Sequence, residues 1–380
     1  MADGIEKARM KIQPVFVICV ASVLSMAIGN SANAQNRTTI VLRDLSVLSD
    51  SGIESFNDNR VLLTDGTSLT WDAILRADVP DESRAEFDRR ISQIGLPMFR
   101  IKSRLESGDW WSIASIAEPM YSLVKPGGDS AGFQFDAETR YLISLAAMYG
   151  RIQSGNREAA VEPFLLAASL QPQIGDDIVP EYAFTQREIN SLISSKLLPV
   201  WFDQENAGLA VDDLSEHIGP GGFPAIGGVL VYRASLATAA GRLNVVREDI
   251  EQLRQQGSHP DWVKVLEARL LFSQDRIDEG LQLLRGKDTF DPACRAVALY
   301  LEGMHPSPTA SSSDASLVSL LTIPAIFGET FEEISSAALY GAAERSGKEG
   351  NVNERRILTN ELLRRYPNTY HGRLAAANEK

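Results

Sequence analysis

The chain has 380 residues and a formal net charge of −13, and 44% of its residues are hydrophobic. This composition is too apolar for a disordered protein and supplies enough apolar side chains for a sizeable core. Because the chain is acidic and has no long run of Lys and Arg, we exclude a nucleic acid as its partner.

The N-terminus has the pattern of a secretory leader. Three basic residues precede the apolar stretch 15–28, and a small-x-small site follows that ends at Ala34. We expect a signal peptide over residues 1–34, cleavage after Ala34, and a protein located in the periplasm or secreted. An uncleaved anchor is the alternative, but the apolar stretch is shorter than the roughly 20 residues of a membrane span. We therefore expect no stable membrane insertion after cleavage. Met10 is an alternative start.

Cysteine and histidine give no sign of a stapled or metal-binding fold. Cleavage of the leader leaves Cys294 as the remaining cysteine, so no internal disulfide can form. The histidines are far apart and form no metal-ligand spacing, and no phosphate-binding loop occurs. We therefore expect a fold that depends on packing, with no metal and no cofactor.

Residues 35–80 have the character of β-structure. Residues 39–42 are a candidate strand, and Asp65-Gly66 separates two apolar runs, which is a strong hairpin signal. Residues 71–75 are expected to open a short helix. We predict a small β-hairpin-containing N-terminal segment that packs on the helices that follow, because a hairpin alone is marginal.

From about residue 81 the apolar period becomes helical. Gly95 and Pro97 predict a break in the first helix. Gly108-Asp109 predicts a turn, and Trp110 begins the next helix. A second hairpin follows in the same range, so the segment 81–172 is expected to consist of helical hairpins.

The second hairpin resembles the tetratricopeptide repeat, whose two halves follow W-x-x-L-G-x-x-Y and A-x-x-x-F…P patterns. The resemblance implies an α-solenoid that binds partners and has no catalytic role of its own. Exported proteins of this kind also look like a broad set of uncharacterised bacterial envelope proteins. The residues that carry the resemblance are Leu142, Leu145, Ala146, Tyr149, Ala160, Phe164, Ala167 and Pro172.

Similar units recur with insertions between them. The turns at Gly241 and Asp275 are 34 residues apart, the length of one tetratricopeptide repeat. A helix is expected between Phe184 and Leu197. Each hairpin covers the apolar face of the next one, so we predict a mainly α protein, a solenoid of degenerate hairpins. The expected parts are an irregular insertion (173–223), tandem hairpins (224–287), a helix with a Pro/Ser-rich loop running from His305 to Ser316 (288–330), and a C-terminal helical hairpin (331–380).

Three aromatic residues are the candidate binding surface: Trp110, Trp111 and Tyr149. Helical spacing places most aromatic side chains of this chain in the core. The two tryptophans are adjacent and cannot face the same way, so one of them is expected to be exposed. Exposed aromatic side chains often anchor protein interfaces.

A competing motif is Gly128-Asp129-Ser130-Ala131-Gly132, which fits the G-x-S-x-G pattern of serine hydrolases. That chemistry requires a strand before Ser130, but the preceding residues have helical character. His217 lies downstream, as do three other histidines, and nothing in the sequence distinguishes it. We therefore expect a protein that is not an enzyme, with a hydrolase using Ser130 as the alternative.

Taken together, these features predict an exported helical-repeat scaffold that binds a protein or peptide partner in the periplasm or cell envelope. The hairpin array and the lack of a coherent catalytic set are the grounds for this hypothesis. Two further alternatives stay open, a self-assembling structural component and a glycan-binding envelope protein.

Overall fold

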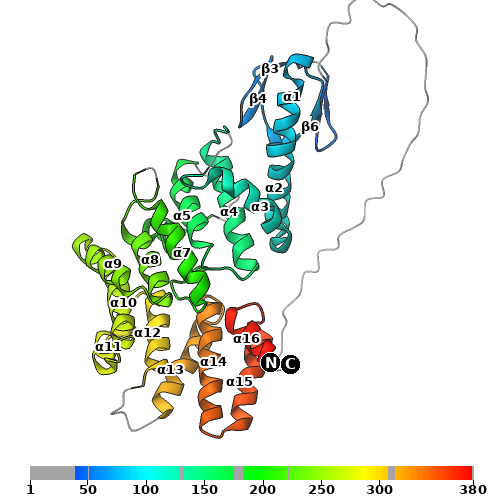
Figure 1. Ribbon diagram of the computed structural model, residues 1–380. Helices are drawn as coiled ribbons and strands as arrows, with labels where there is room; N and C mark the ends of the chain where they lie inside the picture. The colour runs from blue at the N-terminus through cyan, green and yellow to red at the C-terminus, as the bar shows by residue number, and fades with distance from the viewer. Residues whose placement is uncertain are drawn as a thin grey trace, which may run out of the picture. The chain divides into compact units, whose positions relative to one another are not determined.

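Strands come first in the chain and helices follow, as Figure 1 shows. The computed structural model describes residues 39–49, 51–128, 132–174, 183–220, 222–306 and 313–378, which belong to one unit, Thr38–Lys380. The expected signal peptide with its cleavage site at Ala34 lies outside the described residues, and so does Ser130.

Two three-stranded antiparallel sheets form the N-terminal segment, in the orders β2-β1-β6 and β3-β4-β5. Asp65 and Gly66 make the turn between β4 and β5, where Gly66 has a φ of 83°, so the predicted hairpin is confirmed. The helix expected at 71–75 is limited to one 3-10 turn, Trp71–Ala73, because β6 begins at Ile74 to pair with β1. The strands are β1 (Ile40–Leu42), β2 (Val47–Leu48), β3 (Ile53–Phe56), β4 (Arg60–Leu63), β5 (Ser68–Thr70) and β6 (Ile74–Ala77).

An aromatic cluster joins the sheets to the first helix. Trp71 is buried, and its ring lies 5.9 Å from that of Phe56 and 5.0 Å from that of Phe87, which belongs to α1. Arg90 of the same helix pairs with Asp58 at 2.9 Å, and both side chains are largely buried. The sheets therefore pack on the helices, as expected for strands that cannot bury their apolar face alone.

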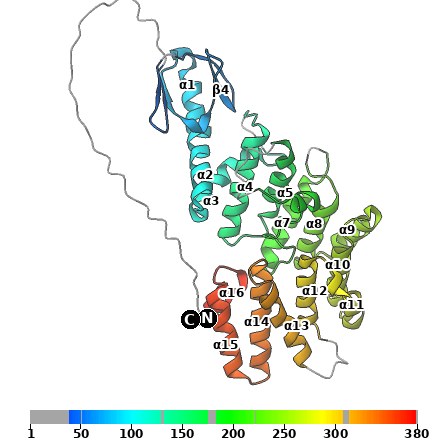
Figure 2. The ribbon, with the colours of Figure 1, turned by 180° about the vertical axis from the view of Figure 1, so that it is seen from behind.

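The rest of the protein is mainly α, and helices that are neighbours in the sequence pack against one another, as in a helical repeat. Figures 1 and 2 show from opposite sides that α3 lies beside α4, and α14 beside α15. None of the described helices is long and apolar enough to span a bilayer. The longer helices are α1 (Asp81–Arg90), α2 (Leu96–Ser107), α3 (Trp110–Val124), α4 (Ala137–Gln153), α5 (Val161–Leu170), α6 (Gln186–Ser191), α7 (Gln204–His217), α8 (Gly227–Ala239), α9 (Leu243–Gln256), α10 (Pro260–Phe272), α11 (Ile277–Leu283), α12 (Pro292–Met304), α13 (Ser313–Ile326), α14 (Glu332–Lys348), α15 (Val352–Arg365) and α16 (Tyr370–Asn378).

The turns between helices follow the sequence signals closely. Gly108 ends α2 with a φ of 66°, and the Asp109 side chain then caps α3. Gly241 and Asp275 both adopt positive φ, at 73° and 62°, between α8 and α9 and between α10 and α11. The predicted hairpin turns at these positions are confirmed.

The predicted break at Gly95 and Pro97 is wrong. A five-residue π-helix, Ile91–Gly95, joins α1 to α2, and its wider turn accommodates Pro97 at the start of α2. Gly95 serves a different purpose, because a Cβ at this position would lie 2.7 Å from the carbonyl oxygen of Trp71. Glycine here permits close packing on the sheets and does not end the helix.

Three parts of the chain hold more helix than the sequence suggested. The helix expected between Phe184 and Leu197 is confirmed as α6, but the segment expected to be an irregular insertion, 173–223, also contains the 14-residue helix α7. Helix α13 begins at Ser313, inside the expected Pro/Ser-rich loop, and the expected C-terminal hairpin, 331–380, contains a further helix, α16, after Pro367. Helix α7 has a regular apolar face that the sequence analysis overlooked, formed by Ala207, Ala210, Val211 and Leu214.

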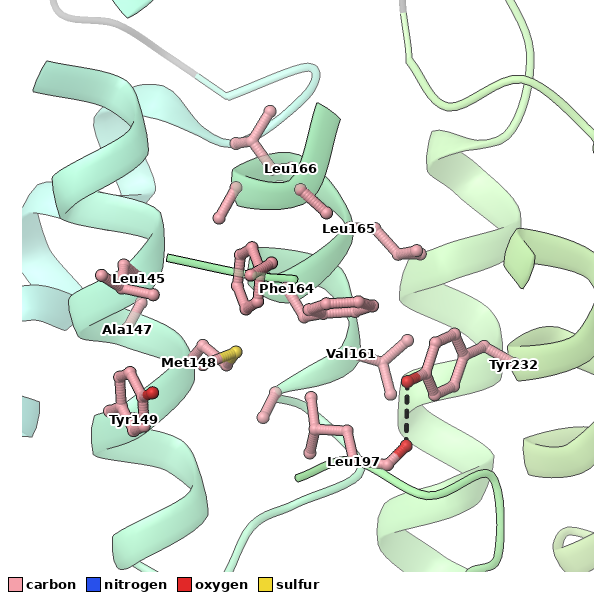
Figure 3. Packing of buried hydrophobic residues seen from close by; sticks show 14 of the residues in the cluster. Leu145, Ala147, Met148, Tyr149, Val161, Phe164, Leu165, Leu166, Leu197 and Tyr232 are labelled. Carbon is pink, nitrogen blue, oxygen red and sulfur yellow. Dashed lines mark hydrogen bonds between the residues drawn. The ribbon is translucent and has the colours of Figure 1, made fainter. Parts of the chain in front are cut away.

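The core of the second hairpin extends to α8. Figure 3 shows Phe164 and Val161 of α5 facing Tyr232. The rings of Phe164 and Tyr232 lie 5.7 Å apart in an edge-on arrangement, and the buried Tyr232 hydroxyl donates a hydrogen bond of 2.9 Å to the Leu197 carbonyl. The repeat-like packing therefore continues through the segment between α5 and α8.

Candidate functional site

The structure brings together two of the three aromatic residues of the predicted binding surface and places the third apart from them. Trp110 is half-buried and stacks on Tyr149 of α4, with ring centroids 4.3 Å apart and an interplanar angle of 28°. Trp111 is 68% exposed and points elsewhere, since it lines none of the cavities described below. Asp109 is the N-cap of α3, so the helix begins at Trp110. This starting point places Trp110 on the side of α3 that faces α4 and Trp111 on another side.

A short irregular segment, 193–198, forms the next wall of the site. Glu188 holds it in place, accepting hydrogen bonds from the Ser195 backbone N–H at 3.0 Å and the Ser194 hydroxyl at 3.2 Å. Burial favours a higher pKa for Glu188, but the hydrogen bonds from Ser195 and Thr185 outweigh it and lower the pKa. Glu188 is therefore a charged anchor for this segment at neutral pH.

Lys196, in the same segment, lies above the Tyr149 ring. Its ammonium nitrogen is 5.4 Å from the ring centroid, within the range of a cation–π contact. The side chain is exposed, so the contact leaves its charge at the edge of the site.

The start of α14 closes the site from the C-terminal part of the chain. Arg157, just before α5, lies 3.7 Å from the Glu333 carboxylate, and both side chains are largely buried. Glu333 also accepts a hydrogen bond of 3.2 Å from the Tyr370 backbone N–H, at the start of α16. These contacts hold the first turns of α14 and α16 against the end of α4.

These elements enclose two adjoining cavities that share Ser195, Thr330 and Phe331. The cavity that we call the Trp110 cavity has a volume of about 570 Å³ and contains Tyr149, Lys196 and three glutamates in its lining. The three glutamates are Glu329, Glu332 and Glu333.

The second space, which we call the Pro292 cavity, has a volume of about 620 Å³. Volumes in this range are typical of sites that take a small molecule or a few side chains. Its lining is rich in apolar groups, among them Ile193, Pro260, Trp262, Pro292, Ala293 and Phe331.

Burial shifts the pKa values of two reactive groups in the lining of the Pro292 cavity. Burial raises the pKa of the Cys294 thiol, so the thiolate needed for nucleophilic attack is not populated at neutral pH. Burial also lowers the pKa of His259, and the Arg187 guanidinium pairs with Asp291. Among the residues that the structure describes, no group of three or more metal-ligating side chains gathers anywhere.

A separate buried cluster involves the histidine that the sequence left undistinguished. His217, at the end of α7, has its Nδ1 3.2 Å from a carboxylate oxygen of Glu162. A Cβ placed on Gly127 would lie 3.7 Å from Nε2 of the same ring. Burial raises the pKa of Glu162, opposed by the positive charges of His217 and Arg151. This pair lies away from both cavities.

Sequence reasoning identified Trp110 and Tyr149 but missed the other residues that line the two cavities. Glu329, Glu332 and Thr330 come from the distant C-terminal part, and nothing in their local pattern relates them to α4. One available signal was the capping-box pattern at Thr185 and Glu188, which marks a helix start inside the supposed insertion.

Compared with known proteins, the chain matches no family model, no curated protein and no solved structure. The assignment of function therefore depends on the site itself.

Proposed function

We propose that this protein is an exported helical-repeat scaffold that binds a peptide or a protein segment in the groove formed by the Trp110 and Pro292 cavities. The observation that carries the proposal is that the two cavities adjoin and share Ser195, Thr330 and Phe331 in their linings. Two adjoining cavities suit an extended chain with several side chains better than a single small molecule.

The walls of the groove support the same proposal. The stacked Trp110 and Tyr149 rings supply a rigid aromatic surface, and such surfaces are enriched among the residues that dominate binding energy. The polar rim provides Ser195, Lys196 and Thr330, whose side chains are exposed and able to select a partner. The proposed location, outside the cytoplasm, is supported by the leader pattern that ends at Ala34.

Thr330 allows a direct test, because its exposed side chain lies at the junction of the two cavities. Thr330→Trp should fill the junction and block the groove with little effect on folding. Thr289→Trp is the matched control, since Thr289 is exposed and outside both cavities.

The measurement is affinity capture from an envelope extract with the purified protein as bait, followed by isothermal titration of a captured partner. We expect Thr330→Trp to weaken binding by about tenfold or more, equivalent to about 1.4 kcal/mol, and Thr289→Trp to leave it unchanged. Equal binding by both variants would rule out the groove as the binding site.

Hydrolysis at Ser130 is the second candidate function, and the His217–Glu162 pair is the observation that favours it. A histidine whose Nδ1 lies 3.2 Å from a buried carboxylate, with its other nitrogen near Gly127, has the residue types of a base and its orienting acid, although no hydrogen bond joins the two atoms. The test is labelling with a fluorophosphonate probe. Labelling of the wild type that is lost in both Ser130→Ala and His217→Ala would favour the hydrolase over the scaffold.

A further inference from the structure

We propose that the occupant of the groove is a peptide segment with a large apolar side chain and, a few residues away, a Lys or Arg side chain. This inference rests on the proposed function and names the chemistry of its partner. Two independent properties of the groove lead to it, the apolar lining of one cavity and the unbalanced charge of the other.

The Pro292 cavity is the place for the apolar side chain. Pro260 and Pro292 present exposed ring surfaces there, and Ile193 and Ala293 are partly exposed beside them. The charged groups in this cavity already have polar partners, and Glu188 accepts hydrogen bonds from Ser194 and Ser195. Arg187 pairs with Asp291, whose backbone N–H donates to Asp261 at 3.1 Å. An apolar side chain would thus displace water from apolar surface without uncovering a charge.

The Trp110 cavity is the place for the basic side chain. Of its two cations, Arg157 pairs with the largely buried Glu333, whereas Lys196 lies over the Tyr149 ring and keeps its charge. Glu329 and Glu332 are both exposed, and neither is ion-paired with any described residue. Two free carboxylates against one ammonium leave this end of the groove with a net negative charge.

Both carboxylates line the same cavity, so each would attract a Lys or Arg side chain bound there. Glu332 also lies in the first turn of α14, where an acidic residue suits the helix dipole. That contribution applies to Glu332 and not to Glu329, which precedes the helix. An acidic peptide would meet both carboxylates and bind poorly.

The place for the apolar side chain and the place for the basic side chain lie next to each other, because the two cavities adjoin. Thr330 and Phe331 line both cavities, and Glu329 and Glu332 flank them directly in the sequence. A chain that crosses Thr330 can therefore place an apolar side chain in the Pro292 cavity and a basic one beside Glu329. The partner must combine both features within one short segment.

The experiment uses three fluorescein-labelled decapeptides in which leucine alternates with lysine, with glutamate or with serine. Fluorescence anisotropy measures their binding to the purified protein at two salt concentrations. We expect the lysine peptide to bind at least about tenfold more tightly than the glutamate peptide, and the preference to shrink at high salt.

Because the whole protein is acidic, a control must separate groove binding from general attraction. The groove variant is Glu329→Lys with Glu332→Lys. The matched control is Glu82→Lys with Glu205→Lys, which changes the net charge equally at two exposed helix starts outside both cavities. We expect the groove variant to lose the lysine preference and the control variant to keep it.

The outcomes distinguish the inference from the proposed function. One outcome keeps the groove but overturns the basic–apolar partner. In it, Thr330→Trp abolishes peptide binding, and the wild type prefers the glutamate or the serine peptide. If Thr330→Trp leaves all peptide binding unchanged, the groove itself is overturned. Equal loss of the lysine preference in the groove and control variants also overturns the inference, because it shows that the preference comes from net charge.

Discussion

Arg157 and Glu333, far apart in the sequence, form a buried ion pair that joins the turn after α4 to the start of α14. The Arg157 guanidinium also lies over the Trp201 ring, 5.4 Å from its centroid, and Glu333 accepts a hydrogen bond from the Tyr370 backbone N–H. A simple helical array has contacts between neighbouring repeats only. This pair adds a long-range contact, and the Trp110 cavity lies beside it.

Breaking this pair should therefore destabilise the protein. Glu333→Gln removes the charge that compensates the largely buried Arg157, and we expect a loss on the order of 3 kcal/mol in the free energy of unfolding. Urea denaturation followed by circular dichroism gives the value. Glu349→Gln, at an exposed position after α14, is the control and should change stability by less than about 0.5 kcal/mol. A loss as small as the control's would show that the pair contributes little.

Gly150 provides a second test of packing. It lies in α4, and a Cβ there would come within 2.7 Å of the Ala114 Cα in α3. We expect Gly150→Ala to force the two helices apart and to lower stability by about 1–3 kcal/mol. Thermal unfolding measures the change.

Gly208 is the matched control for this substitution. It also lies inside a helix, α7, but a Cβ would meet no atom closer than 3.8 Å. Gly208→Ala should raise stability by up to about 1 kcal/mol, because alanine has the higher helix propensity. If both substitutions stabilise the protein, the close approach of α3 and α4 is not real.

The sequence predicted local features well because they depend on local physics. Gly66, Gly108 and Gly241 mark turns through their own backbone freedom, and amphipathic spacing marks α4 and α5. The break predicted at Gly95 failed for a tertiary reason. Nothing near Gly95 in the sequence shows that Trp71 packs against it and requires a residue without a Cβ.

The candidate site could be predicted only in part for the same reason. Tyr149 and Trp110 belong to adjacent helices, so hairpin geometry brings them together. Thr330, Glu329 and Glu332 reach the groove through long-range contacts such as the Arg157–Glu333 pair, which no pattern of spacing encodes. Long-range pairing of this kind is visible only in the folded chain.

His371 should make the protein sensitive to mild acid. It is buried at the start of α16, where its ring centroid lies 4.5 Å from that of Phe202. The rings of Tyr340 and Tyr370 lie beside it. Burial lowers its pKa from 6.5 to about 4. The unfolded chain therefore binds this proton more tightly than the folded one. The stability that His371 contributes is present above pH 6.5 and is lost as the pH falls towards 4.

The comparison that isolates this effect is His371→Phe, which keeps an aromatic side chain and removes the titration. Between pH 7 and pH 4 the wild type should lose up to about 3 kcal/mol more stability than the variant, following the size of the pKa shift. Urea unfolding of both proteins across this range gives the difference. Parallel pH profiles for the two proteins would contradict the buried, neutral histidine.

The two adjacent tryptophans should differ in both stability and binding. Trp110 stacks on Tyr149 and lines the groove, whereas Trp111 is 68% exposed and lines neither cavity. Trp110→Ala should cost about 1–3 kcal/mol of stability and weaken binding of the lysine peptide, since it removes an aromatic contact and part of the cavity wall.

Trp111→Ala, one residue along the same helix, should leave both quantities nearly unchanged. Trp110→Phe separates the two effects, because it keeps an aromatic ring for folding while reducing the surface offered to the peptide. Stability near the wild-type value with binding about threefold weaker would support a direct contact between Trp110 and the peptide. If Trp111→Ala is the substitution that abolishes peptide binding, the binding surface lies on the opposite side of α3 and the groove is not the site.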